Sequence, residues 1–213
     1  GMQKLVIDLR GNGGGYMDAA VNIIDEMLEA NKLIVYTQGK SRTRKNEVST
    51  STGALKGLTI GVLIDESSAS ASEIVAGAIQ DNDRGIILGR RSFGKGLVQE
   101  PSQWPDGSAL RLTIARYYTP TGRCIQKSYK DGIKQYYRDY YDRVEKGELM
   151  SIDSIDFPDS LKFTTPEGKT VYGGGGIMPD VFVPYDTTGH TYFYSELIYG
   201  GISHSNFVRN RGG

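Results

Sequence analysis

The sequence is poor in the residue types that most metal and redox sites need. Its 213 residues include one cysteine, Cys124, and two histidines, His190 and His204. A lone cysteine forms no internal disulfide, and two histidines in polar surroundings do not make a metal-ligand cluster. The sequence therefore predicts no metal and no cofactor, and it gives little support to a Ser-His-Asp triad. We expect Cys124 to be a small buried side chain.

Net charge and long apolar runs are missing as well. The 25 lysines and arginines balance the 25 aspartates and glutamates, so no overall field favours nucleic acid or an anionic membrane. No apolar stretch approaches the ~20 residues of a membrane-spanning helix. Because 38% of the residues are hydrophobic, the chain is long enough for one sizeable core, and we expect one domain over residues 1–213.

The spacing of apolar residues predicts strands alternating with helices in the first half of the chain. Strands are expected at 5–9, 33–37, 58–65 and 85–89, helices at about 18–30 and 70–82, and a surface loop or hairpin at 39–57. Later segments predict a hairpin through Pro105-Asp-Gly107, a helix at 135–146, a hairpin at 163–172 and a strand at 181–183. This order favours a mixed α/β domain with a curved sheet and additional hairpins.

A serine cluster opens the helix expected at 70–82. It reads Ser-Ser-Ala-Ser-Ala-Ser-Glu-Ile over 67–74, so hydroxyls lie beside the unsatisfied N–H groups and positive dipole of a helix start. Lys95 follows on a glycine-flanked turn, where a desolvated lysine loses its proton more readily than in water. The pattern indicates a nucleophile and a base without histidine. Alternatively, the serines cap the helix and the lysine lies in a solvated turn.

Two glycine-rich segments invite other interpretations. The loop Arg10-Gly-Asn-Gly-Gly-Gly15 presents backbone N–H groups to an anion or oxyanion, or is simply a tight turn. A dinucleotide fingerprint starting at Gly11 fails, because Tyr16 occupies its last position. The segment from Gly89 to Gly96 matches a phosphate-binding loop except at its end, where glycine has no hydroxyl for magnesium and a strand, not a helix, is expected to follow.

Several of these motifs together resemble the carboxy-terminal processing, or tail-specific, proteases. The similar stretches are Asp-Leu-Arg-Gly-Asn-Gly-Gly-Gly at 8–15, Ser-Ala-Ser-Ala-Ser-Glu-Ile at 68–74, Ala-Ile-Gln-Asp at 78–81, Ser-Phe-Gly-Lys-Gly-Leu-Val-Gln at 92–99 and Gly-Gly-Gly-Gly-Ile-Met-Pro-Asp at 173–180. The resemblance covers most of residues 8–184. It implies a ββα-spiral, crotonase-like core, here a fragment of a longer protein without the family's PDZ domain and N-terminal helices.

The resemblance also implies a role for each matching residue. Ser70 corresponds to the nucleophile, Lys95 to its base, and Gln99 to the glutamine that orients the lysine. The N–H groups of Ala71 and Gly14, or of a glycine beside Gly14, correspond to the oxyanion hole. Glu73 and Asp81 correspond to residues that support the site without reacting. Strand alternation independently places the side chains of Lys95 and Gln99 on one face of the chain.

These roles predict a serine endopeptidase that cleaves peptide bonds near protein C-termini through an acyl-enzyme. Its partner is a protein or peptide bound in extended form, and family likeness implies the bacterial periplasm or the outside of the cell. Two other classes fit the same fold. A non-catalytic binding module keeps the glycine loop but needs no contact between serine and lysine. An acyl-thioester enzyme of crotonase type uses the oxyanion hole without a serine nucleophile. No sequence feature specifies the oligomeric state.

Overall fold

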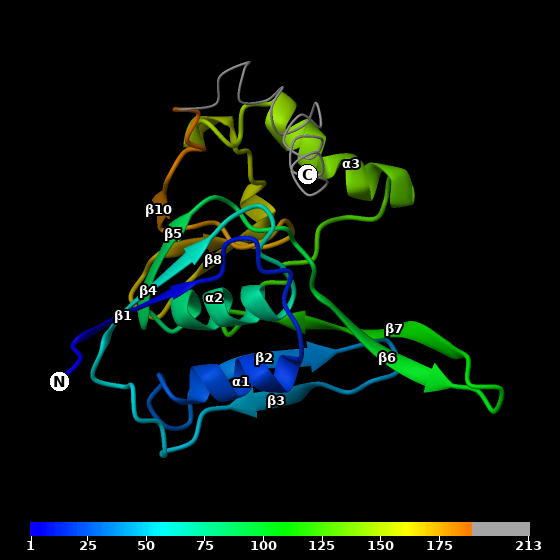
Figure 1. Cartoon of the computed structure of the whole chain (residues 1–213), viewed down its shortest axis with the longest axis horizontal. Helices are drawn as coiled ribbons and strands as arrows, with labels where there is room; N and C mark the ends of the chain where they lie inside the picture. Colours follow the sequence, from blue (N-terminus) through cyan, green and yellow to red (C-terminus); the bar gives the residue numbers. More distant parts are fainter. Residues whose placement is uncertain (189–213) are drawn as a thin grey trace, which may run out of the picture.

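A parallel sheet and an antiparallel sheet lie on opposite sides of helix α2 in the computed structural model, which describes residues 1–188 (Figure 1). The parallel sheet has the order β1-β4-β5-β10 and the antiparallel sheet the order β3-β2-β7-β6. The bounds of the parallel strands are Lys4–Asp8 (β1), Thr59–Ile64 (β4), Gly85–Gly89 (β5) and Val181–Phe182 (β10). Those of the antiparallel strands are Leu33–Gln38 (β2), Lys45–Val48 (β3), Leu97–Gln103 (β6) and Ala109–Tyr118 (β7).

Helix α2, Ala71–Asp81, is buried on nearly all sides because it packs between the two sheets. Every residue from 72 to 81 is buried, and the apolar ones pack with inward-facing residues of β4 and β5 such as Val62 and Ile87. Gly77 lies where Thr119 packs closely against α2, since an added Cβ would stand 2.7 Å from Thr119 Cγ2. The core therefore fixes α2, and with it Ser70 at the helix start.

Helix α1 is shorter than its apolar spacing predicts. It spans Met17–Asp25 instead of continuing to residue 30. The N–H groups of Met27 and Leu28 both donate to Ile24 O, at 2.9 and 3.1 Å, so the chain tightens and leaves the helix. Both side chains are nevertheless buried in the core. The apolar pattern identified the buried face correctly and misplaced the end of the helix.

The hairpin β6–β7 projects from the antiparallel sheet as an arm (Figure 1). Its turn is the expected one, with Trp104 N donating to Ser108 O at 2.8 Å and Gly107 at a φ of 84°. All residues from 99 to 113 are exposed. The strands therefore rely on their mutual pairing once they leave the core.

The remaining elements follow β7. Helix α3, Gly132–Glu145, confirms the helix expected there, and a small sheet pairs β8, Lys162–Thr164, with β9, Thr170–Tyr172. Two short 3-10 turns, Ile152–Ser154 and Asp159–Leu161, connect them. The buried Arg143 of α3 donates to the carbonyls of Arg91 and Ser92, at 2.6 and 3.1 Å. This helix thereby holds the turn that precedes Lys95.

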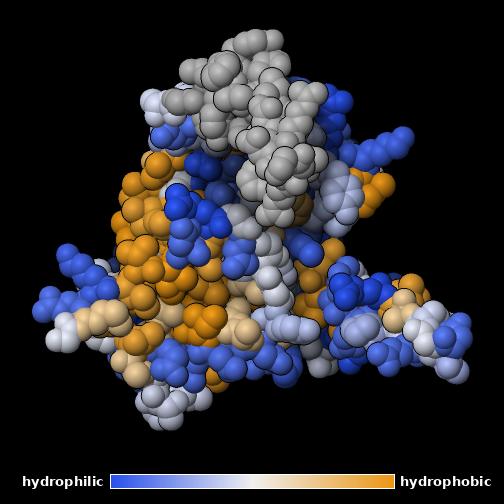
Figure 2. Space-filling model, viewed as in Figure 1, coloured by the Kyte–Doolittle hydropathy of each residue, from blue (hydrophilic) through white to orange (hydrophobic). Residues whose placement is uncertain are grey.

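The outer face of the parallel sheet carries exposed apolar side chains. Val6 of β1, Ile86 of β5 and Val181 of β10 are 63%, 42% and 41% exposed. Figure 2 shows the apolar residues gathered on the side of the molecule that holds these strands. Among the described residues, no helix has both the length and the apolar character needed to cross a bilayer.

Candidate active site

Ser70 stands at the N-terminus of α2 in a strained conformation. Its φ of 58° and ψ of −117° lie outside the regions that a side-chain-bearing residue ordinarily adopts. Such a backbone costs on the order of 1–3 kcal/mol and is found mainly at active sites, where the surrounding structure imposes it. No sequence signal revealed this conformation, because serine at a helix start is also an ordinary cap.

The hydroxyls of the neighbouring serines form hydrogen bonds within the protein. Ser68 is fully buried, and its Oγ donates to Leu9 O at 2.8 Å and accepts from Asp65 N at 2.9 Å. Ser72 Oγ donates to Asn12 O at 3.0 Å. Both hydroxyls thus hold the glycine-rich loop against the start of α2.

The buried carboxylate of Glu73 joins the start of α2 to the lysine turn. One oxygen accepts from Ser92 Oγ at 2.5 Å and Gly94 N at 2.7 Å, and the other from Lys95 N at 2.8 Å and Ser70 N at 2.9 Å. Desolvation raises the pKa of this carboxyl, although the four hydrogen bonds oppose the rise. Glu73 therefore sets the spacing between Ser70 and Lys95 without facing the cavity.

The backbone N–H groups of residues 92–96, the lysine turn, all have hydrogen-bond acceptors within the protein. Besides the two amides bound by Glu73, Ser92 N donates to Ile177 O, Phe93 N to Ser68 O, and Gly96 N to Gln126 Oε1, at 2.8–3.0 Å. Strand β6 follows, where a phosphate-binding loop would open a helix. These contacts, and the strand that follows, argue against nucleotide binding by residues 89–96.

A cavity of about 500 Å³ brings the predicted residues together. Ser70, Ala71, Lys95 and Gln99 all line it, although they come from α2, the turn before β6, and β6 itself. Apolar side chains, including those of Met17, Ile74 and Leu97, form much of the remaining wall. The Lys95 amine has no ion-pair or hydrogen-bond partner among residues 1–188. The site therefore holds a serine, an uncommitted amine and an apolar surface.

The glycine loop passes directly behind Ser70. A Cβ added to Gly14, whose φ is 92°, would stand 2.5 Å from Ala69 O and 2.7 Å from Ala71 N, so only glycine fits. The Gly14 N–H donates to Asn12 Oδ1 at 2.9 Å. Gly15 lines the cavity, and within the described chain neither its N–H nor that of Ala71 has a hydrogen-bond acceptor. Both amides are therefore free to donate to a ligand in the cavity.

Gln99 lies beside a register shift between β6 and β7. The partner residue changes from Ala115 at Val98 to Thr113 at Gln99, so the extra residue, Ile114, belongs to β7, and alternation along β6 still predicts a common face for Lys95 and Gln99. The Gln99 amide nitrogen donates to Thr113 Oγ1 at 3.4 Å. Gln99 shares the cavity with Lys95, and its amide is here directed to the neighbouring strand.

Tyr117 is a site residue that sequence reasoning missed. It is 3% exposed, lines the cavity together with Ser70, and its hydroxyl donates to Lys95 O. Burial raises its pKa well above the ordinary value, so the hydroxyl keeps its proton. The inward alternation of Ala115 and Tyr117 continues β7 to Tyr118 and brings Tyr117 to the cavity.

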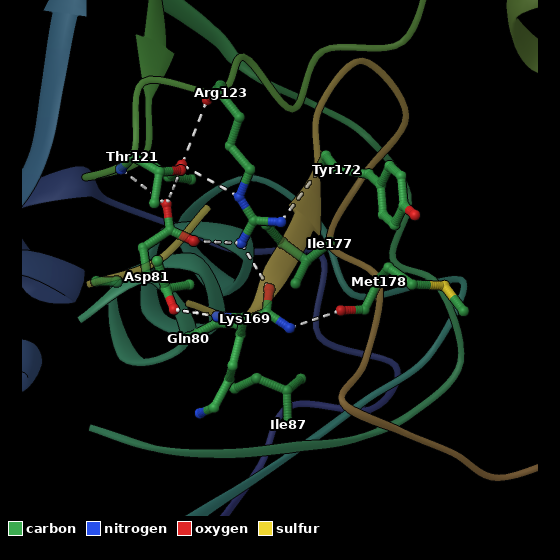
Figure 3. A network of polar contacts seen from close by, with 12 residues as sticks. Gln80, Asp81, Ile87, Thr121, Arg123, Lys169, Tyr172, Ile177 and Met178 are labelled. Atoms are coloured by element: carbon green, nitrogen blue, oxygen red, sulfur yellow. Dashed lines mark hydrogen bonds and ion pairs between the residues drawn. The ribbon is translucent and has the colours of Figure 1, made fainter. Parts of the chain in front are cut away.

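Asp81 acts at the other end of α2, roughly 15 Å from Ser70 at 1.5 Å per residue. Its carboxylate forms an ion pair of 2.6 Å with Arg123, both side chains being 0% exposed, and accepts from Thr121 N and Oγ1 at 3.0 and 2.7 Å (Figure 3). Arg123 also donates to Gln80 Oε1 at 2.6 Å. Asp81 therefore supports the turn after β7 and does not reach the cavity.

Cysteine and histidine, the residue types that are scarce in the sequence, contribute little to the described part of the chain. Residues 1–188 contain no group of three or more His, Cys, Asp or Glu side chains arranged to hold a metal ion. Cys124 is half-buried, not buried as expected, because it lies on the bridge that closes the turn after β7. His190 and His204 lie outside the described residues.

Comparison with known proteins gives one consistent relationship. The family model described as peptidase family S41 matches residues 1–137. A carboxy-terminal-processing protease of Bartonella bacilliformis is 48% identical over 129 residues, which are 59% of this chain and 29% of that protein. A chloroplastic C-terminal processing peptidase of Tetradesmus obliquus is 39% identical over 128 residues, 60% of this chain and 27% of that protein.

The structural comparison agrees. The solved structure of a photosystem II D1 C-terminal processing protease matches with a TM-score of 0.58 and 29% identity, over 85% of this chain and 34% of that chain. The chain thus spans about a third or less of the length of these relatives. The family match covers the glycine loop, the serine cluster and the lysine turn. The chain belongs to peptidase family S41, in the group of C-terminal processing serine proteases.

Proposed function

We propose that the chain is the core of a serine endopeptidase that works through a Ser70–Lys95 dyad. The observation that carries the proposal is the strained Ser70, which shares a cavity with an uncommitted lysine and two open backbone N–H groups. The mixed α/β fold matches a structure of the family, and we assign it a crotonase-like, ββα-spiral core forming one domain of a longer protein. Neither a binding module nor a thioester enzyme requires these features together.

The reaction follows from the groups in the cavity. The neutral Lys95 amine takes the Ser70 proton as Oγ attacks the substrate carbonyl carbon, and the N–H groups of Gly15 and Ala71 hold the resulting oxyanion. The lysine ammonium then gives its proton to the leaving amine as the peptide bond breaks. Water, losing a proton to Lys95, attacks the acyl ester, and Ser70 Oγ regains that proton. Gln99 orients the lysine once substrate fills the cavity.

The free edge of β6 offers a place for an extended peptide. Trp104 N donates to Ser108 O, so alternation along the ladder turns the backbone groups of Gln103, Pro101 and Gln99 away from β7. Proline is tolerated on such an edge because no ladder N–H is lost. We place the substrate as an added strand beside β6, with its cleaved bond at Ser70.

The wider biological setting rests on the relatives. Those named above are a bacterial and a chloroplastic C-terminal processing protease. We infer that this protein acts near the C-termini of exported proteins, in the periplasm or outside a bacterial cell. Because the chain spans only part of such proteins, activity is to be measured on the full-length protein that contains it.

Labelling with a fluorophosphonate tests the proposal directly. We expect one adduct, on Ser70, together with hydrolysis of casein by the full-length protein. Ser70→Ala is expected to lose both, whereas Ser68→Ala and Ser72→Ala keep the label, since their hydroxyls bind backbone carbonyls. Peptide mass spectrometry locates the adduct. A label on Ser68 or Ser72 in the Ser70→Ala variant, or peptide binding without any label, would contradict the proposed nucleophile.

Removing the hydroxyl of Tyr117 is expected to lower the rate of acylation about 10-fold to 100-fold, because the backbone of Lys95 loses the hydrogen bond that fixes it at the cavity. In Tyr117→Phe the effect should appear in kcat with KM little changed. Tyr118→Phe is the matched control, since Tyr118 stacks on Tyr36 with ring centroids 4.8 Å apart. Burst kinetics with an ester substrate measure acylation. Equal rates in the two variants would show that the Tyr117 hydroxyl has no positioning role.

A further inference from the structure

We propose that Arg111, on the arm, binds a carboxylate of the substrate a few residues from the cleaved bond. The proposal rests on the proposed function in one respect, namely that a peptide occupies the cavity that Ser70 lines. Arg111 lies on β7 and lines this cavity together with Gln99 and Pro101 of β6. It thereby makes the arm a specificity element.

Arg111 is unusual among the arginines because it has no partner. Within residues 1–188, only Arg111 and Arg116 lack a hydrogen bond, an ion pair and a ring contact. Arg84, for example, donates to four backbone carbonyls at 2.7–3.0 Å. The arginines in ion pairs are Arg10, Arg42, Arg90, Arg91, Arg123, Arg138 and Arg143. The guanidinium of Arg111 is therefore free to bind a ligand.

The charge of the cavity favours an anion. Among residues 1–188, the only ionisable side chains that line it besides tyrosines are Lys95 and Arg111, and no aspartate or glutamate of this range does so. Arg111 stays charged at every relevant pH, while Lys95 must be neutral to act as a base. A carboxylate accepts two parallel hydrogen bonds from a guanidinium. Arg111 therefore suits a carboxylate ligand better than a lysine, which is a point charge, would.

The register of the arm places Arg111 beside the substrate path. Arg111 lies opposite Pro101, and Thr113 lies opposite Gln99, so these four side chains share the face that borders the cavity. Leu110, Leu112 and Glu100 belong to the other face, where Glu100 pairs with Arg42 at 3.1 Å and cannot neutralise Arg111. From Leu97 to Pro101 an extended strand rises ~13 Å. A carboxylate held there lies about four residues along the peptide.

Matched peptides test the proposal in the full-length protein. We expect peptides carrying a glutamate about four residues from the cleaved bond, or ending there in a free carboxylate, to exceed their glutamine or amide counterparts about fivefold in kcat/KM. Arg111→Gln should remove this preference, and Arg111→Glu should reverse it in favour of a lysine-containing peptide. The two pairs of peptides separate an acidic side chain from a chain terminus as the source of the carboxylate.

Arg116→Gln is the matched control, because Arg116 is an equally unpaired cation of the same strand but lies outside the cavity. It should keep the preference for the carboxylate. Loss of the preference in Arg116→Gln as well, or its survival in Arg111→Gln, would overturn the proposal. Fluorescence anisotropy of the same labelled peptides on Ser70→Ala measures binding without turnover. A fivefold loss of affinity on adding Arg111→Gln supports the carboxylate site even if Ser70 proves not to be a nucleophile.

Discussion

Lys95→Arg is expected to be as inactive as Lys95→Ala, with kcat/KM at least about 10⁴-fold below that of the unaltered full-length protein. Arginine keeps a positive charge and a similar length, but it does not lose its proton in a protein. The substitution therefore removes the base while retaining the charge. Lys95 has no ion-pair partner in residues 1–188, so its loss leaves no carboxylate unpaired and should not unfold the chain.

The pH dependence gives a second test of the same role. Because only the neutral amine accepts a proton, kcat/KM of the unaltered protein should rise from neutral to alkaline pH. The control is Lys45→Arg, which alters an exposed lysine paired with Glu47 at 2.8 Å and should follow the same profile as the unaltered protein. Hydrolysis by Lys95→Arg, or a rate that does not change with pH, would show that Lys95 contributes charge alone.

Arg123→Met is expected to lower the free energy of unfolding by about 3–5 kcal/mol, the usual cost of stranding one member of a buried ion pair. The substitution leaves the Asp81 carboxylate in a fully buried position, and it also removes the hydrogen bond to Tyr172 O at 3.0 Å. A domain typically has only 5–15 kcal/mol of stability, so this loss is a large part of the total. Urea unfolding of the chain measures it.

The exposed ion pair between Arg42 and Glu100 is the control. Its side chains are 58% and 55% exposed, so Arg42→Met should cost under about 1 kcal/mol. Adding Asp81→Leu to Arg123→Met should recover part of the loss, because no charge then remains unpaired. The outcome against this view is additivity. If the double variant loses as much free energy of unfolding as Arg123→Met and Asp81→Leu lose in sum, packing, and not the ion pair, holds the turn after β7.

The sequence predicted the elements whose signals are local. Apolar runs located β1, β4 and β5, helical spacing located α2 and α3, and the Pro105–Gly107 turn located the arm. Ser70, Lys95 and Gln99 came from motifs, and the structure places all three on one cavity. Their mutual positions depend on α2 and β6, which are separate in the chain.

What the sequence did not predict depends on contacts between distant segments. The bulge at Ile114 arises from the pairing of β7 with β6, and the choice between Gly14 and its neighbours, which the sequence left open, depends on one hydrogen bond from Gly14 N–H to Asn12. Tyr117 belongs to the site because β7 brings it, from a different segment of the chain, to the cavity that Ser70 lines. Glu73 was placed in a supporting role by resemblance, but its four donors come from both halves of the site and no periodicity reveals them.

The two walls of the cavity belong to parts of the molecule that open at different free energies. The wall that holds Ser70 is the start of α2, whose residues 72–81 are all buried, whereas the opposite wall is the arm, exposed throughout residues 99–113. A two-stranded ribbon in water is marginally stable, so we expect its amides to exchange with solvent through local fraying and those of α2 to exchange only on global unfolding. The peptide that we propose to bind beside β6 would add a third strand to the ribbon. Its capture would then include the entropic cost of ordering the arm, and each residue paired with β6 would reduce the fraying.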